Sequence, residues 1–272
     1  MPALKIGFTA DLHQPITPAW MVEEIANQAA DWGPEVFIIG GDLGESLQDF
    51  QRCLALFRKK IPCPILVIPG NHDLWVRRFS DSKKLWFEEL PETVSQEGCH
   101  WLEGNSFQVK GVGFAGTIAW YDYSAAGPTV SCSHLEFAQK KFDCNSDALL
   151  VDWEWSDPEF AHKVSSAFLG KLDKLEKDKE VSQVIVVTHF PILPCQIHQD
   201  TEIMGWDFSN AYAGNLTLGK EVEKYSKVSH VLSGHTHIPK KQTWPRAVGK
   251  PIETQVIGAD YHKPTWIGLA LE

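Results

Sequence analysis

The chain lacks the cysteine spacing of a disulfide-rich or cysteine-ligated protein. Its six cysteines form no Cys-x-x-Cys pair and no dense framework, so we interpret them as reduced thiols. No segment approaches the length and apolarity of a membrane span, and the first residues show no basic stretch followed by a long apolar one. These absences predict a soluble, cytoplasmic protein with no membrane partner.

Basic residues are also few. The chain has 25 Lys and Arg against 35 Asp and Glu, which gives a net charge of −10 over 272 residues. Broad binding to nucleic acid needs a basic surface, so this class of partner is not expected. Hydrophobic residues make up 43% of the chain, enough for a large core. We find no repeat, low-complexity segment or linker, and therefore expect one domain over residues 1–272.

What the chain does contain is a series of short apolar runs that each lead into polar residues. Runs that are apolar at every position, as at 36–39, 65–69 and 184–187, are typical of strands buried on both faces of an α/β sheet, and ligands bind at the carboxyl ends of those strands. By itself, each motif could equally be a polar turn or a strand-end cap. Residues 4–9, 36–39, 65–69, 184–187 and 228–232 are the runs, and the polar residues after them are Asp11, His13, Asp42, Asn71, His72, Asp73, His189, His235 and His237.

The polar residues favour a metal site made of oxygen and imidazole ligands. No thiolate is among them, which suits manganese, iron or zinc and argues against structural zinc or an iron–sulfur cluster. In extended chain, residues i and i+2 share a face, so Asp11 and His13 could converge, as could His235 and His237. Seven ligands suit two ions that share a carboxylate: Asp11, His13, Asp42, Asn71, His189, His235 and His237.

The order of these motifs resembles one family. Asp-x-His, Gly-Asp, Gly-Asn-His-Asp, His and Gly-His-x-His, between Asp11 and His237, are similar to the motifs of the calcineurin-like metallophosphoesterases. The resemblance implies an α/β fold, a four-layer α/β/β/α sandwich of two mixed sheets flanked by helices. It also implies that Asp42 bridges two transition-metal ions. The first ion would be held by Asp11, His13, Asp42 and His237, and the second by Asp42, Asn71, His189 and His235.

The expected activity is hydrolysis of a small phosphodiester or phosphomonoester, with a nucleotide as one candidate substrate. A metal-bridging hydroxide would attack phosphorus in line, and His72, oriented by Asp73, would protonate the leaving oxygen. The chain is more similar to small bacterial-type phosphodiesterases than to Ser/Thr protein phosphatases. In those phosphatases an Asp-Arg pair follows the second motif and Glu follows Asn-His, whereas here Leu-Gly-Glu-Ser follows Asp42, and Asp73 replaces that Glu.

Two alternatives belong to other classes. HD-type phosphohydrolases also carry a His-Asp pair, but they are all-helical, whereas His72 and Asp73 follow an apolar run and a glycine. A catalytically silent scaffold of the same fold that binds a protein partner is the more serious alternative. Such a scaffold would be expected to have lost ligands, and none is missing here.

The rest of the chain gives weaker signals. Residues 20–32 and 48–59 have helical spacing, with Trp20, Ile25 and Ala29 as inward positions of the first helix. Residues 117–180 interrupt the strand pattern, and we expect a cap or insertion there, either over the crevice or as peripheral packing. The second sheet is expected to contain short strands at 99–103, 107–109, 112–115, 253–257 and 265–271.

Overall fold

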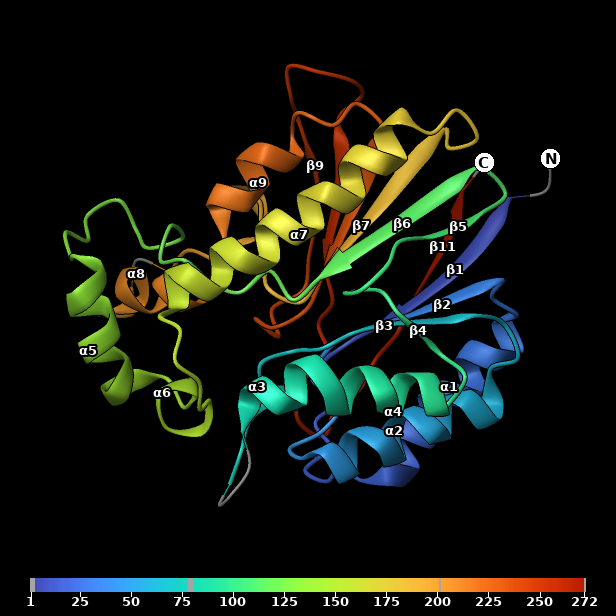
Figure 1. The fold of residues 1–272 in the computed structure, drawn as a ribbon, viewed down its shortest axis with the longest axis horizontal. Coiled ribbons are helices and arrows are strands. Elements are labelled where there is room, and N and C mark those ends of the chain that lie inside the picture. Colours follow the sequence, from blue (N-terminus) through green and yellow to red (C-terminus); the bar gives the residue numbers. More distant parts are fainter. Residues whose placement is uncertain (1–2, 78–80, 201, 272) are drawn as a thin grey trace.

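The computed structural model describes residues 3–77, 81–200 and 202–271. Figure 1 shows two sheets stacked against each other with helices on both outer faces. Between the sheets lies an apolar layer in which Phe8 and Ile38 of one sheet join Phe114 and Val187 of the other. The four-layer α/β/β/α sandwich expected from the sequence is confirmed.

The first sheet holds the amino-terminal motifs. Its strands pair in the order β11(Ile267–Leu271)-β1(Leu4–Thr9)-β2(Val36–Gly40)-β3(Ile65–Ile68)-β4(His100–Trp101). Strands β1 to β4 are parallel, and β11 runs antiparallel to β1. Two sequence assignments were wrong, because residues 100–101 and 267–271 extend the two edges of this sheet rather than the second one. The pattern of such short edge strands does not specify which sheet they join.

The second sheet holds the carboxyl-terminal motifs. Its order is β5(Phe107–Val109)-β6(Val112–Thr117)-β7(Gln183–Thr188)-β8(Val228–Ser233)-β10(Ile252–Val256)-β9(Lys240–Trp244). Strands β6, β7, β8 and β10 are parallel. The carboxyl ends of β7 and β8 therefore open on one edge, close to those of β1, β2 and β3.

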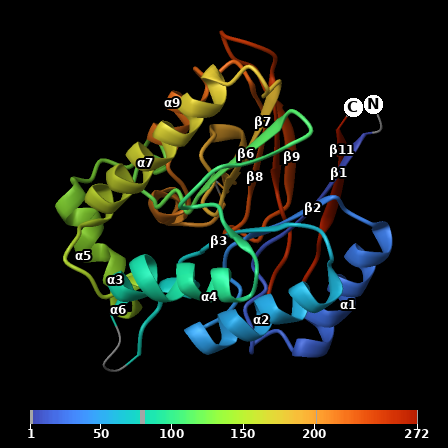
Figure 2. The ribbon, with the colours of Figure 1, turned by 45° about the vertical axis from the view of Figure 1, so that its right-hand side comes forward.

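Helices α1(Ala19–Trp32), α2(Leu47–Lys60) and α4(Leu90–Gln96) cover the first sheet (Figure 2). Helix α1 buries Val22, Ile25, Ala26 and Ala29, a stripe with helical spacing. Trp20 was wrongly expected to point inward: it is 66% exposed, because it precedes that stripe by two residues and lies on another face. The remaining short segments are α3(Ser82–Lys84), a π-helical turn (Leu85–Glu89) and 3₁₀ turns at His72–Leu74, Pro194–Gln196 and Asn210–Tyr212.

Helices α7(Asp157–Lys177) and α9(Leu216–Val222) cover the second sheet (Figure 2). Helix α7 packs along β6 and buries Phe160, Phe168 and Leu172. Helix α7, the last part of the region 117–180, therefore belongs to the fourth layer of the sandwich. Apolar and charged positions are mixed along α7. Its sequence is therefore compatible with a helix that covers a sheet and equally with a helix of a cap.

The part of that region that does not join a layer is residues 118–156, called the insertion below. It contains α5(His134–Cys144) and α6(Asp147–Leu150), and with α8(Trp206–Ser209) it forms one end of the molecule in Figure 1. None of the helices in the described residues is both long and apolar enough to cross a membrane.

Candidate metal centre

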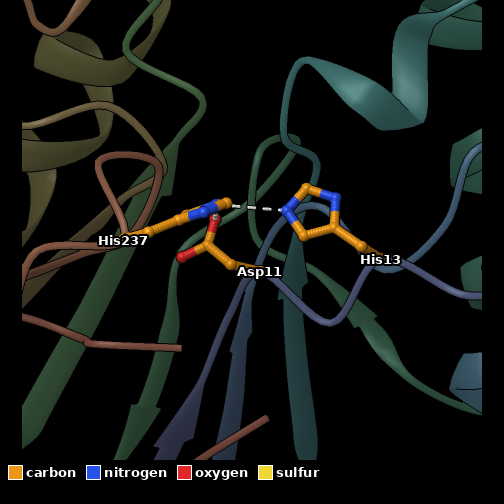
Figure 3. A group of neighbouring side chains, drawn as sticks. All are labelled: Asp11, His13 and His237. Carbon is orange, nitrogen blue, oxygen red and sulfur yellow. Dashed lines mark hydrogen bonds and ion pairs between the residues drawn. The ribbon is translucent and has the colours of Figure 1, made fainter. Parts of the chain in front are cut away.

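The strand-end residues of both sheets converge on one edge of the sandwich. Asp11, His13 and His237 form one group, whose ligand atoms all lie within 4.8 Å of one another (Figure 3). Asp11, Asp42 and His189 form a second group by the same measure. Residues from four strand ends, up to 226 positions apart in the chain, thus surround one small volume.

The backbone that brings these side chains together is left-handed rather than extended. Asp11, His13, Asp42, His235 and His237 all have left-handed φ angles, between 48° and 71°. The expectation that Asp11 and His13, or His235 and His237, converge through extended alternation was therefore wrong. Left-handed backbone costs a non-glycine residue roughly 1–2 kcal/mol and is common at functional sites.

The separations between ligand atoms suit cations. His13 Nε2 and His237 Nε2 are 3.2 Å apart, and His189 Nε2 lies 3.1 Å from Asn71 Oδ1. Asp42 Oδ2 lies 3.4 Å from His189 Nε2 in its own group and 3.7 Å from His13 Nε2 in the other. Two ligands bound at about 2.1 Å to one ion are themselves roughly 3.0–3.4 Å apart.

The outer contacts of the histidines decide which ring nitrogen faces the centre. Nδ1 of His13 is 3.3 Å from Glu45, Nδ1 of His237 is 3.1 Å from Asp260, and Nδ1 of His189 is 2.9 Å from the Gly40 carbonyl. Because oxygen acceptors take the Nδ1 protons, the Nε2 lone pairs point inward. Two lone pairs that face each other at 3.2 Å repel unless a cation lies between them, so the donor set fits a metal.

His235 is turned the other way. Its Nε2 lies 3.2 Å from the Tyr212 carbonyl, which leaves Nδ1 as the nitrogen available to a metal, and its ring centroid is 5.3 Å from that of His189. Its backbone N–H donates to the Asp11 carboxylate at 3.0 Å. Burial lowers the pKa of His235 well below its ordinary value, and the charge of His189 lowers it further. A neutral imidazole is the form that binds a metal.

The buried carboxylate at the centre is held in its charged form. Asp42 is 1% exposed, and burial alone would raise its pKa. The neighbouring His189 and His72 outweigh that effect and hold the pKa well below the ordinary value. In return, burial lowers the pKa of His189, but the Asp42 charge outweighs it and raises that pKa to about 9.

Gly70 leaves the space that Asp42 occupies. A Cβ at this position would lie 2.0 Å from Asp42 Oδ1. The backbone N–H of the nearby His72 donates to the same oxygen at 2.9 Å. The glycine of the Gly-Asn-His-Asp motif is therefore required by close approach to the central carboxylate.

His72 lies at the rim of the centre, with its side chain 11% exposed. Its Nδ1 is 2.8 Å from Glu45 Oε1, its ring stacks on Trp75 with centroids 3.5 Å apart, and its Nε2 lies 4.0 Å from Asp42 Oδ2. Burial tends to lower the pKa of His72, but Asp42 and Glu45 outweigh it and raise the pKa above its ordinary value. The surrounding carboxylates thus favour the protonated form of His72, whose Nε2 lies on the side of the metal centre.

Asp73 does not orient His72, and that sequence-based role was wrong. Its carboxylate accepts backbone N–H bonds from Asp42 and Gly70, both at 2.8 Å, and from Leu43 and Gly44 at 3.0 and 3.2 Å. The 3₁₀ turn that begins at His72 sends consecutive side chains in different directions. Asp73 therefore fastens the loop after β3 to the loop after β2, and burial raises its pKa to about 7.

Three functional candidates were missed from the sequence: Glu45, Asp147 and Asp260. Glu45 contacts both His13 and His72, and the only signal for it was its place three residues after Asp42. Asp147 accepts a hydrogen bond from the Asn71 amide, and Asp260 contacts His237. The last two lie in segments where no pattern in the sequence indicates a site.

A cavity of about 260 Å³ adjoins the centre at His235. It is lined by the insertion, through Cys144, and by the segment after β7, through Trp206 and Tyr212. None of the described residues that line it is Lys, Arg, Asp or Glu. A larger cavity, of about 720 Å³, lies between the insertion, α7 and α9. None of the candidate ligands lines it, so it is separate from the candidate metal centre.

A sandwich of two mixed sheets, with carboxylate and imidazole side chains gathered at the strand ends, defines an α/β protein with a candidate metal centre. The chain belongs to the calcineurin-like phosphoesterase family, whose model matches residues 4–239. Metal-dependent phosphoester hydrolysis is the general activity of such proteins. The resemblance inferred from the motifs is thereby confirmed.

Solved structures agree on the fold. A phosphopantetheinyl hydrolase from Mycobacterium tuberculosis is 18% identical, with a TM-score of 0.70 over 97% of this chain and 95% of that one. A dimetal phosphatase from Danio rerio is 14% identical, with a TM-score of 0.51 over 100% of this chain and 93% of that one. At these identities the similarity shows the fold alone. A search of curated protein sequences found no match.

Proposed function

We propose that the protein is a dinuclear metal-dependent hydrolase of a small phosphodiester or phosphomonoester. The observation that carries this proposal is the position of Asp42. Its Oδ2 lies 3.7 Å from His13 Nε2 in one ligand group and 3.4 Å from His189 Nε2 in the other. One carboxylate placed between two sets of ligands is the arrangement that two neighbouring ions require.

The ligands divide between two sites that share Asp42. When bound, two ions would lower the pKa of water and neutralise charge on a phosphate. Manganese, iron and zinc all suit carboxylate, amide and imidazole ligands. The first site would comprise Asp11, His13, Asp42 and His237, and the second Asp42, Asn71, His189 and His235.

The residues at the rim supply the proton. In the protonated ring of His72, Glu45 accepts the Nδ1 proton, so the second proton, on Nε2, is directed toward the centre. The ring is kept in this orientation by Trp75, on which it stacks. His72 would donate from Nε2 to the leaving oxygen as the phosphorus–oxygen bond breaks. Asp73 fixes the loops that carry His72 and Asp42.

The cavity beside His235 would take the organic part of the substrate. Its aromatic residues and the absence of Lys and Arg among its described lining residues suit an uncharged group rather than a second phosphate. Nucleosides and phosphopantetheine-like chains are both candidates, the latter because a structural relative is described as a phosphopantetheinyl hydrolase. The six free cysteines are consistent with a cytoplasmic location.

The alternative, a silent scaffold that binds a protein partner, predicts neither bound metal nor turnover. A screen of the metal-loaded protein separates the two functions, with Mn²⁺, Fe²⁺ and Zn²⁺ compared on an aryl phosphomonoester, a bis-aryl phosphodiester and a cyclic nucleotide. We expect hydrolysis of at least one ester, lost in Asp42→Asn, which lacks the central carboxylate. Two bound metals without hydrolysis of any ester would contradict the proposal.

A further inference from the structure

Asp147 lies outside every sequence motif, yet it touches the metal centre. It is the first residue of α6 in the insertion, is 1% exposed, and stands 76 positions after Asn71 in the chain. Its Oδ1 accepts a hydrogen bond from Asn71 Nδ2 at 2.9 Å. The insertion therefore contacts a candidate ligand directly.

The Asn71 amide has two ends, and only one can bind a cation. Its oxygen has lone pairs, whereas its NH₂ group only donates, so rotation by 180° would present a donor to the metal site. In the structure the oxygen lies 3.1 Å from His189 Nε2, on the side of the second ligand set. A carboxylate on the opposite side selects this orientation, because an ionised carboxylate can only accept.

Asp147 is itself held by donors. Trp75 Nε1 donates to Oδ1 at 2.7 Å, and the Tyr121 hydroxyl donates to Oδ2 at 3.1 Å. Burial raises the pKa of Tyr121 well above its ordinary value, and the Asp147 charge raises it further, so the hydroxyl keeps its proton. Trp75 also stacks on His72. These contacts fix the position of the Asp147 carboxylate, and that carboxylate in turn fixes the orientation of the Asn71 amide.

We propose that Asp147 is a positioning residue that fixes the Asn71 amide with its oxygen toward the second metal, so that the insertion completes the metal centre. The proposal rests on the dinuclear site assigned above and extends it to residues outside the family motifs. It predicts an effect on one metal and not on the other. The first site has no contact with Asp147.

The chain offers a matched control in Asp157. This second buried carboxylate, 7% exposed, begins α7 and accepts hydrogen bonds from Trp120, Tyr123 and Lys141. It resembles Asp147 in burial and in its aromatic partners, but it touches none of the candidate ligands. Replacing it tests whether general loosening of this region is enough to weaken metal binding.

The experiment is a calorimetric titration of the metal-stripped full chain with Mn²⁺, with metal content measured after dialysis. We expect the parent protein to bind two Mn²⁺. Asp147→Leu should keep the tighter ion and bind the second about 10- to 100-fold more weakly, the usual effect of removing an outer partner of a ligand. Asp147→Asn should stay near the parent, because its amide oxygen still accepts from Asn71 and Trp75.

Asp157→Asn should lower the melting temperature without changing either affinity. If Asp147→Leu does not fold, Tyr121→Phe removes one donor to the same carboxylate and should weaken the second ion in the same direction. Parent-like binding of both ions by Asp147→Leu and Tyr121→Phe, or equal weakening by Asp157→Asn, would overturn the proposal. Two ions in the parent without any hydrolysis would refute the proposed function alone.

Discussion

Replacing Glu45 with alanine should remove much of the proton donation by His72 while His72 itself stays in place. Glu45 Oε1 is 2.8 Å from His72 Nδ1 and 3.3 Å from His13 Nδ1, and its side chain is 10% exposed. Without this carboxylate, the ring loses the acceptor that points Nε2–H toward the centre. Stacking on Trp75 restricts the ring but does not select which nitrogen faces inward.

The size of the effect follows from the role of the proton. General acid catalysis contributes about 10²–10⁴ in rate, which is roughly 2.7–5.4 kcal/mol of barrier at 1.36 kcal/mol per tenfold. His72→Ala should lose this whole factor, and Glu45→Ala about 10- to 100-fold, because a misoriented ring still donates part of the time. An ester with a good leaving group needs little help from an acid.

The assay therefore compares leaving groups. Steady-state kcat of the metal-loaded variants is measured on 4-nitrophenyl and on alkyl phosphoesters, with metal content determined in parallel. Both losses should be large for the alkyl ester and small for the nitrophenyl ester. Glu88→Ala, which removes an exposed carboxylate from the same half of the chain, controls for the lost charge and should behave like the parent.

Equal losses on both esters would refute this reasoning, since they would show that Glu45 acts on metal binding through His13 rather than on proton transfer. Loss of metal from His72→Ala would equally contradict the role of His72, which is a proton donor and not a ligand in our proposal.

Three further predictions concern metal content and stability. Asp42→Asn should lose both metals and activity together, as measured by metal analysis, because the carboxylate is shared by the two ligand groups. Gly70→Ala should also lose both metals and activity, since its Cβ would lie 2.0 Å from Asp42 Oδ1. Unchanged metal content would show that the loop after β3 can shift to accommodate the added methyl group. Lys171→Met should destabilise the fold by about 3–5 kcal/mol in denaturant unfolding, because Lys171 donates to the Leu102 and Gly116 carbonyls at 2.8 and 2.7 Å beside the buried Glu103. Burial raises the pKa of Glu103 to about 7, above its unfolded value, although the Lys171 charge lowers it. Without Lys171 the pKa of Glu103 in the fold should rise further, so stability is lost up to a higher pH in the variant, and its difference from the parent should grow as pH rises above about 7.

The convergence of the strand-end residues could be predicted from the sequence because parallel strands bring their carboxyl ends to one edge. Apolar runs marked the strands, and the residue after each run was then placed without knowledge of side-chain detail. Edge strands were not assignable in this way, because β4 and β11 are short and their patterns fit either sheet. Tertiary pairing, not local preference, decided their place.

The outer residues of the site could not be predicted for a different reason. Glu45 lies in a loop, Asp147 in the insertion and Asp260 just before a turn, and no periodicity marks any of them. Their positions depend on how loops from distant parts of the chain meet. The left-handed backbone at Asp11 and His13 was equally invisible, because the same two residues satisfy an extended pattern.

These outer residues share a chemical logic. Histidine and asparagine are ambiguous ligands, since each can present either a donor or an acceptor to a metal. An ionised carboxylate only accepts, so it removes the ambiguity wherever it faces the outer end of such a ligand. Glu45, Asp147 and Asp260 do so for His13, Asn71 and His237. In the proposed function, the acidic balance of the chain would thus serve phosphate binding indirectly: three carboxylates outside the centre orient the candidate ligands, and the positive charge that meets a phosphate would come from the ions that those ligands hold.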